Sequence, residues 1–306
     1  MSARSTFLAA TALVALASMP AYAVPLVGIV GGDLIGFDSA TPNTVTNRLT
    51  VSGLGTDTIR GLDFRPSTGQ LYALGQTNFN QPVNLFTINT VTGAATRVGG
   101  VNNSSQIDFG FAFNPVPDAI RVVNADNTNL RVNPTTAATT IDTPLAFAAG
   151  DSNFGDDPVV TAVAYTNQVA GATTTMLFGI DVRNSALVSI PAPNSGALTT
   201  VGSLGVVLFQ STVGAGQGFD IDAVSGQAFA SLGLSTGGTG LYNINLATGS
   251  ASLLGRFANG SPRVITVGLL GQGDGNGGAI AVPEPASMAL LGMGLAGLLA
   301  ARRRRG

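Results

Sequence analysis

Residues 61–100 read GLDFRPSTGQLYALGQTNFNQPVNLFTINTVTGAATRVGG, and this stretch decides the fold. It holds four short apolar runs, which are residues 62–64, 70–74, 84–89 and 94–98. Turn-forming residues separate the runs: Pro66 presets one backbone angle, and Gly69 and Gly93 accept the positive φ that tight turns require. Four strands joined in this way form an antiparallel meander.

The same pattern recurs along the chain. Residues 61–73 (GLDFRPSTGQLYA) align without a gap on residues 218–230 (GFDIDAVSGQAFA), and weaker copies begin at Gly110 and Ala162. The residue before the later turn of each unit marks the repeat, at Phe37, Ile88, Val132, Ile190 and Ile244, with separations of 51, 44, 58 and 54 residues. A period near fifty with four strands per period is typical of propeller blades. The sequence therefore predicts an all-β propeller with five blades of four antiparallel strands.

The first unit supplies three strands instead of four, at residues 26–30, 34–38 and 45–51. The missing strand is predicted at residues 263–270 (RVITVGLL), which follow the last full unit. A propeller whose last strand completes its first blade has no open edge where the ring closes. We therefore expect this C-terminal strand to close the ring, and its deletion to open it.

Composition excludes several classes of function. The chain of 306 residues has no His, no Cys and no Lys, and its one Glu, Glu284, lies near the C-terminus. Without these residues there is no Ser-His-Asp triad, thiol nucleophile, ordinary zinc site or P-loop. Once the terminal segments described below are set aside, nine Arg and fifteen Asp give a net charge near −6. This acidic balance argues against nucleic acid as a partner.

Asp63 and Asp220 occupy equivalent positions of the repeat, each between two apolar residues. One interpretation makes them a pair of carboxylates lining the channel, as an Asp-based carbohydrate-active enzyme would need. The other makes them structural side chains that accept hydrogen bonds from backbone amides of a neighbouring turn. Recurrence at equivalent places favours the structural interpretation.

The densest acidic stretch is a predicted loop at residues 151–157, DSNFGDD. Its oxygen-bearing candidates for calcium are Asp151, Asn153, Asp156 and Asp157. Oxygen ligands at alternate loop positions suit calcium, although Gly155 comes one place too early for an EF-hand and Ala162 replaces its final Glu. The same residues also form ordinary turns. Calcium is one hypothesis and a solvated loop between blades is the other; no other cofactor is predicted.

Residues 1–23 are predicted to be a secretory signal peptide. Arg4 supplies the positive start, residues 7–17 form the apolar core, and Ala21 and Ala23 form an A-x-A cleavage site. The mature chain would then begin at Val24.

The C-terminal segment combines three features in order. A Gly-rich linker at residues 271–281 precedes a segment at 282–306 that opens with Pro283, Glu284 and Pro285. Residues 286–301 are an apolar run, which as a helix would span about 24 Å, close to the thickness of a bilayer core. The run ends at a cluster of cations, Arg302, Arg303, Arg304 and Arg305, which would hold the C-terminus on the cytoplasmic side as a membrane stop.

This arrangement resembles the PEP-CTERM sorting domain of Gram-negative bacteria that produce exopolysaccharide. The resemblance covers about the last 25 residues and implies a substrate of an exosortase, a membrane protease similar to a transpeptidase that cuts near the Pro-Glu-Pro motif. The implied route runs through the export machinery and a transient tether in the inner membrane to the cell surface or the extracellular matrix. The preceding domain, residues 24–270, resembles an uncharacterised domain of unknown function with a propeller-like repeat, which implies no activity.

These observations favour a non-enzymatic binding or structural propeller at the cell surface or in the biofilm matrix. Its expected partners are exopolysaccharide or a surface protein, because loops on a propeller face bind without titrating chemistry. The alternatives are an Asp-based carbohydrate-active enzyme and a calcium-stabilised surface module.

Overall fold

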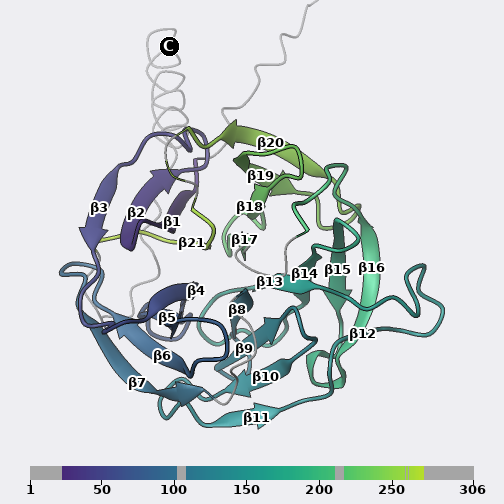
Figure 1. Ribbon diagram of the computed structural model, residues 1–306, viewed down its shortest axis with the longest axis horizontal. Coiled ribbons are helices and arrows are strands. Elements are labelled where there is room, and N and C mark those ends of the chain that lie inside the picture. Colours follow the sequence, from purple (N-terminus) through teal and green to yellow (C-terminus); the bar gives the residue numbers. More distant parts are fainter. Residues whose placement is uncertain (1–22, 102–107, 211–216, 259, 261, 272–306) are drawn as a thin grey trace, which may run out of the picture.

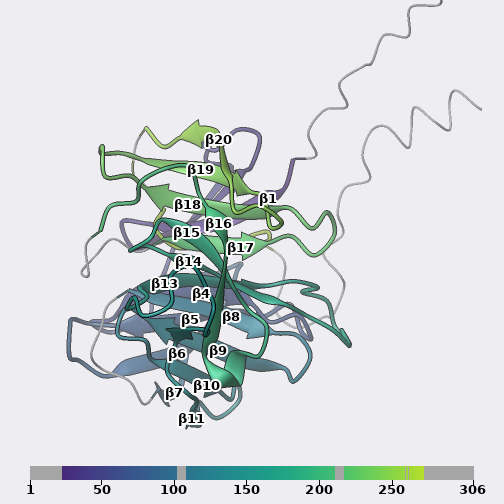
Figure 2. The ribbon, with the colours of Figure 1, turned by 90° about the vertical axis from the view of Figure 1, so that its right-hand side faces the viewer.

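The computed structural model describes residues 23–101, 108–210, 217–258, 260 and 262–271. Five antiparallel sheets stand around a central axis, as Figure 1 shows from one face of the ring and Figure 2 from its side. The chain is an all-β propeller with five blades, as the repeat predicts. The one short helical turn of the described residues is η1 (Pro193–Ser195).

In every blade the strands follow one another from the innermost strand outward. Blade 1 consists of β21 (Ile265–Val267), β1 (Pro25–Val30), β2 (Asp33–Asp38) and β3 (Asn47–Thr50). Blade 2 consists of β4 (Thr58–Phe64), β5 (Leu71–Gln76), β6 (Val83–Ile88) and β7 (Ala95–Val101). Blade 3 consists of β8 (Phe109–Asn114), β9 (Ala119–Asn124), β10 (Asn129–Val132) and β11 (Thr139–Ile141).

Blade 4 consists of β13 (Val160–Tyr165), β14 (Leu177–Asp181), β15 (Ala186–Ile190) and β16 (Ala197–Ser203). A short fifth strand, β12 (Ala146–Phe147), pairs with the outer edge of β16 in parallel. Blade 5 consists of β17 (Gly218–Ile221), β18 (Ala228–Gly233), β19 (Thr239–Ile244) and β20 (Ala251–Arg256).

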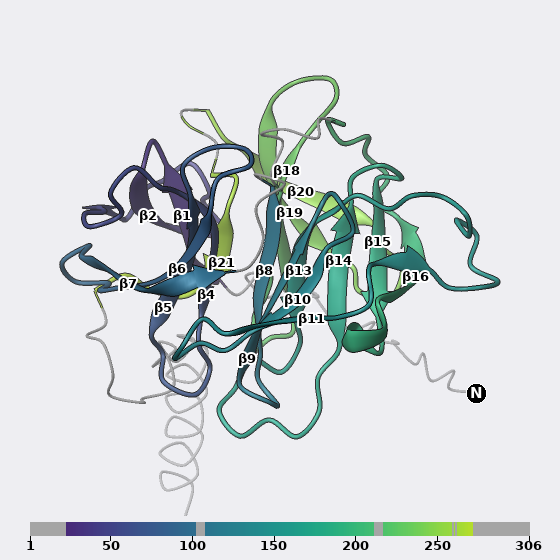
Figure 3. The ribbon, with the colours of Figure 1, turned by 60° about the horizontal axis from the view of Figure 1, so that its bottom comes forward.

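The ring closes through β21. This strand pairs antiparallel with β1, so that Leu26 lies opposite Val267 and Val27 opposite Thr266. The five innermost strands contact one another in a closed cycle, β4 to β8 to β13 to β17 to β21 and back to β4, and Figure 3 shows β21, β4, β8 and β13 around the middle of the ring. The prediction that the C-terminal strand completes the first blade is confirmed, although the strand is shorter than residues 263–270.

The five marker residues of the repeat are also confirmed. Phe37, Ile88, Val132, Ile190 and Ile244 each lie on the third strand of a blade, and all are buried. Blades pack face to face, so both faces of the inner strands are buried against neighbouring blades. Every residue of β5 and β13 is buried. The outermost strands, such as β20, stay largely exposed.

Close approach between inner strands explains the glycine that opens the repeat. A Cβ at Gly61 would lie 2.5 Å from the Cβ of Phe111 in the next blade, and one at Gly218 would lie 2.7 Å from the backbone nitrogen of Ile265. Real Cβ atoms do not approach other heavy atoms so closely, so both positions exclude any side chain. Glycine here lets blade 2 pack against blade 3 and blade 5 against blade 1.

The closure predicts the effect of truncation. Ending the chain after Pro262 removes β21, together with the buried side chains of Ile265 and Thr266, and exposes the edge of β1. We expect the melting temperature of the exported protein to fall by at least about 10 °C, because each kcal/mol lost lowers it by a few degrees. Ending the chain after Gly271 is the matched control and should leave melting unchanged. Equal melting of the two truncated proteins would contradict the closure.

Candidate functional site

Each blade has one residue at the same repeat position of its innermost strand. This position is defined by the marker of the blade. The marker pairs with a residue of the second strand, and that residue pairs in turn with a residue of the innermost strand. The position in question is the one just before that last residue. In blades 1 to 5 the residues at this position are Thr266, Asp63, Ala112, Ala164 and Asp220. We call this set the channel ring. The carboxylates of Asp63 and Asp220 therefore come from the two blades that flank blade 1, on either side of Thr266.

The channel ring is held together by hydrogen bonds between blades. Thr266 Oγ1 lies 2.9 Å from Asp220 Oδ2 and 3.2 Å from Asp63 Oδ1. The backbone N–H of Val267 donates to Asp220 Oδ2 at 2.6 Å, and that of Phe113 donates to Asp63 Oδ2 at 2.6 Å. Each carboxyl thus accepts an amide from the innermost strand of the next blade. This supports the structural interpretation, with the difference that the amides belong to strands and not to turns.

The hydroxyl of Thr266 has one proton and faces two carboxyl groups. A hydroxyl donates one hydrogen bond, so the second contact needs a proton on one carboxyl. Burial raises the pKa of Asp63 well above its ordinary value, and the charge of Asp220 raises that pKa further. Burial also raises the pKa of Asp220, to about 6. We therefore place the proton on Asp63, which donates to Thr266 Oγ1, while Thr266 donates to Asp220.

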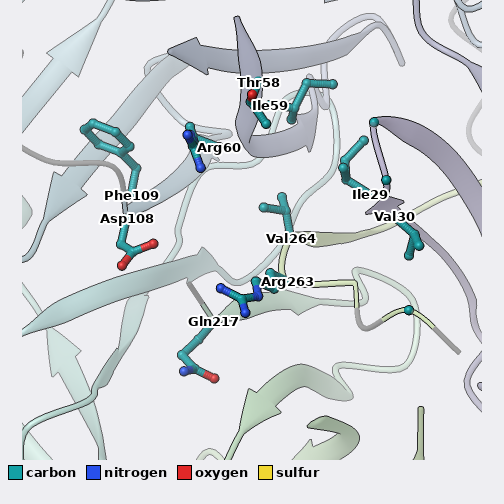
Figure 4. A pocket seen from close by; sticks show the side chains of 13 residues that line it. Ile29, Val30, Thr58, Ile59, Arg60, Asp108, Phe109, Gln217, Arg263 and Val264 are labelled. Carbon is teal, nitrogen blue, oxygen red and sulfur yellow. The ribbon is translucent and has the colours of Figure 1, made fainter. Parts of the chain in front are cut away.

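A pocket of about 410 Å³ opens where the innermost strands begin. Its polar lining comes from Thr58, Arg60, Asp108, Gln217 and Arg263, and its apolar lining includes Ile29, Val30, Ile59 and Val264. Figure 4 shows Arg60 and Arg263 extending toward the space between them, with Asp108 and Gln217 around it. Arg60 precedes Asp63 by three residues on β4, a distance of roughly 10 Å along a strand. The pocket is therefore the mouth of the channel, and its volume is within the range of small-ligand sites.

The repeat places a second ring of side chains at this mouth. The residues three places before the channel ring are, in blades 1 to 5, Arg263, Arg60, Phe109, Thr161 and Gln217. We call this set the mouth ring. Four of its five members line the pocket, Thr161 being the exception. Sequence reasoning missed this site, although alignment of the repeats one residue further upstream would have placed Arg60 and Gln217 at the same level.

Arg60 is an incompletely paired cation. Burial lowers the pKa of its guanidinium, and the nearby Asp108 partly opposes that effect. Its Nε is buried and has no hydrogen-bond partner. Among the described residues the ion pairs are Arg48–Asp33, Arg65–Asp118, Arg121–Asp142, Arg131–Asp142 and Arg183–Asp157. Neither arginine of the mouth ring takes part in any of them.

The predicted calcium loop is attached to blade 4 by its own side chains. Asp151 accepts hydrogen bonds from the backbone N–H and the hydroxyl of Thr200, at 2.6 and 2.7 Å. Asn153 donates its side-chain amide to the same hydroxyl, and Asp157 accepts from Arg183 at 3.0 Å. In the described part of the chain no three carboxylates are grouped as a metal site. The structure therefore does not bring Asp151, Asp156 and Asp157 together, and calcium binding stays a prediction.

Most of the predicted processing sites lie outside the described residues. These are Ala21, Pro283, Glu284, Pro285, the apolar run 286–301 and Arg302 to Arg305. Ala23 is exposed, whereas Val24 is buried and donates its backbone N–H to Ser39 Oγ at 2.9 Å. Val24 is therefore part of the folded domain, and the predicted cleavage before it stays a prediction. The residues that the structure describes include no helix with the length and apolar character needed to cross a membrane.

The chain belongs to a family described as a domain of unknown function, DUF4394, whose model matches residues 33–267. Residues 281–305 match the PEP-CTERM protein-sorting motif. The resemblance of the tail is thereby confirmed. The motif identifies an exported protein whose precursor is anchored in the membrane and processed by an exosortase. No curated protein matches the chain.

Several solved structures are similar to this chain at a low level. The glutaminyl cyclase of Myxococcus xanthus is 14% identical, with 70% of this chain and 84% of that chain covered and a TM-score of 0.42. A chain of the nidogen–laminin complex is 12% identical, with coverages of 80% and 98% and a TM-score of 0.47. TolB from Acinetobacter baumannii is 12% identical, with coverages of 76% and 53% and a TM-score of 0.45. Similarity at this level transfers no activity to this chain.

The channel ring predicts an unusual dependence of stability on pH. A carboxyl whose pKa is raised in the folded state stabilises the protein below its unfolded pKa, near 4, and loses that contribution as the pH rises through the folded value. For Asp220 that value is about 6. The pKa of a surface carboxyl such as Asp118 is lowered by its hydrogen bond to Arg65. The stability that such a carboxyl contributes is lost only in more acidic solution. We expect a higher melting temperature at pH 5 than at pH 8.

Two amide variants test the position of the proton. In Asp63→Asn the side-chain amide accepts a hydrogen bond from the backbone N–H of Phe113 and donates one to Thr266 at every pH. The decline of the melting temperature above pH 5 should therefore become shallower, and the melting temperature at pH 8 should fall little. Asp220→Asn places an NH₂ group where only acceptors fit, and should lower stability by about 1–3 kcal/mol. Melting curves between pH 5 and pH 8 measure both effects. A wild-type protein that melts higher at pH 8, or equal losses in the two variants, would show that the proton is misplaced.

The hydrogen bonds of the loop at 151–157 predict how the protein responds to calcium. Both carboxyl oxygens of Asp151 already accept hydrogen bonds, so a calcium ion would have to displace them. We expect the melting temperature of the exported protein to be the same in millimolar calcium and in EDTA. A calcium-dependent rise that Asp151→Asn abolishes would establish the metal site, by the linkage of binding to folding.

Proposed function

We propose that this chain is a non-enzymatic binding module of the cell surface or extracellular matrix, and that its ligand enters the mouth of the propeller channel. The observation that carries the proposal is the pocket at the mouth ring, where polar and apolar side chains from several blades converge. Ligand sites commonly combine an apolar wall with a few convergent polar groups. Sorting by the C-terminal motif delivers the domain to a compartment where polysaccharide is the abundant partner.

The distribution of carboxyl groups favours binding over hydrolysis. A glycosidase needs two carboxyl groups on either side of the scissile bond, with space for the sugar between them. Asp63 and Asp220 are buried, and one hydroxyl fills the space between them. At the mouth, Asp108 is the one carboxylate among the described residues that line the pocket. The pair that the sequence offers for catalysis is therefore engaged in closing the ring.

A co-sedimentation assay tests the proposal. The exported protein, purified in mild detergent, is incubated with exopolysaccharide extracted from cultures of the cells that make it. We expect the protein to sediment with the polymer and the number of reducing ends to stay constant, because binding breaks no glycosidic bond.

Two outcomes would point elsewhere. Release of new reducing ends that Asp63→Asn and Asp220→Asn abolish, with the melting temperature unchanged, would establish the carbohydrate-active enzyme instead. Failure to sediment with any extracted polymer would leave a structural or protein-binding role and would contradict the proposal.

A further inference from the structure

We propose that the mouth ring recognises the carboxylate of an acidic sugar, with the guanidinium groups of Arg60 and Arg263 as the anion-binding pair. The inference rests on the proposed function and names the class of ligand. Both arginines hold the same position of the repeat in neighbouring blades, one on β4 and one just before β21. Both extend into one pocket (Figure 4).

The charge of the pocket is opposite to that of the domain around it. The domain is acidic, and most of its arginines are neutralised by aspartates or, for Arg97, hydrogen-bonded to Asn84. Arg60 and Arg263 make no ion pair among the described residues, and Arg60 keeps a buried Nε without a partner. A buried donor without a partner is costly. Because this nitrogen is buried, an anion in the pocket would act instead on the charge of the guanidinium, whose pKa burial lowers.

The size of the positive charge selects the anion. Two guanidinium groups and the carboxylate of Asp108 leave one net positive charge at the pocket. One negative charge balances this, whereas a phosphate dianion would place surplus negative charge beside Asp108. The flat carboxylate also matches the fork of a guanidinium, which binds it through two parallel hydrogen bonds. The site thus favours a carboxylate over phosphate.

The remaining lining suits a sugar ring. The polar lining includes the hydroxyl of Thr58, a group that can donate to and accept from sugar hydroxyls, whereas Gln217 Oε1 already accepts the backbone N–H of Gly233. Ile29, Ile59 and Val264 supply an apolar wall for the carbon face of a ring. The volume of about 410 Å³ admits one or two sugar units and not a longer segment. The polymer would therefore present a single acidic residue, or its end, to the mouth.

Comparing two polymers with the same sugar backbone separates the contribution of charge to binding from the contribution of shape. Polygalacturonate carries one carboxylate per sugar, and its fully methyl-esterified form is neutral. We expect the exported protein, measured by calorimetry at fixed salt, to bind polygalacturonate at least about tenfold more tightly than the ester. Dextran sulfate and inorganic phosphate complete the set of probes and report whether any anion suffices.

Three variants locate the binding. Arg60→Gln and Arg263→Gln each remove one charge, and each should weaken binding of polygalacturonate by about tenfold or more. Arg256→Gln is the matched control, because Arg256 is exposed on the outermost strand of blade 5 and also makes no ion pair among the described residues. It should bind as the wild type does. Melting curves confirm that each variant is folded.

Each contrary result has a distinct meaning. Equal affinity for the two galacturonans would overturn the carboxylate proposal and leave the binding module intact. Equal weakening by all three variants, or equal affinity for dextran sulfate or phosphate, would replace a specific site with diffuse electrostatic attraction. Absence of binding to every polymer, in the extracted exopolysaccharide as well, would overturn the proposal and the proposed function together.

Discussion

The structure depends on one hydroxyl that bridges three blades. Thr266 comes from the end of the folded chain and lies between Asp63 of blade 2 and Asp220 of blade 5. A propeller gains its stability only when the last blade meets the first, because an open ring leaves strand edges unpaired and blade faces exposed. Here the closing strand has three residues, so pairing with β1 alone is a small contribution. The buried hydrogen bonds of Thr266 and Val267 add the link to both neighbouring blades.

This way of closing the ring separates two levels of the propeller axis. At the deeper level, two buried carboxyl groups accept hydrogen bonds from Thr266 and from backbone amides. Three residues upstream, the same repeat positions carry Arg60, Phe109, Gln217 and Arg263, which line the pocket. One repeat therefore produces two rings with different tasks. The deeper ring links blades 1, 2, 3 and 5 by hydrogen bonds, and four members of the mouth ring line the pocket to which we assign the proposed ligand.

The sequence predicts the fold well because the relevant signals are local. Turn residues such as Pro66 and Gly69 define hairpins, and the markers from Phe37 to Ile244 define the period; all of this follows from short-range backbone chemistry. Closure by residues near 265 is also predictable, since the first unit lacks a strand. The strand proves shorter than predicted because its pairing with β1 is confined to Ile265–Val267.

The site is harder to predict because it needs convergence from distant segments. Arg60 and Arg263 are separated by most of the chain, and neither belongs to a recognisable motif. The structural role of Asp63 and Asp220 follows from their recurrence in the repeat, but the partner hydroxyl does not, because Thr266 lies in a strand with little resemblance to the other units. The loop at Asp151 is a different case, in which composition and contacts point in different directions. Its acidic composition suggests a metal, whereas Thr200 and Arg183 already occupy its oxygen atoms.

The most direct test of this account is native-state hydrogen exchange at the backbone amide of Val267. That amide donates to Asp220 across the ring junction. If β21 closes the ring as an integral part of one cooperative structure, this amide should exchange only when the whole domain unfolds, with the same free energy of opening as core amides of blade 3. An opening free energy several kcal/mol lower at Val267, with blade 3 still protected, would contradict the account, because the ring would then open at its junction while the other blades remain folded.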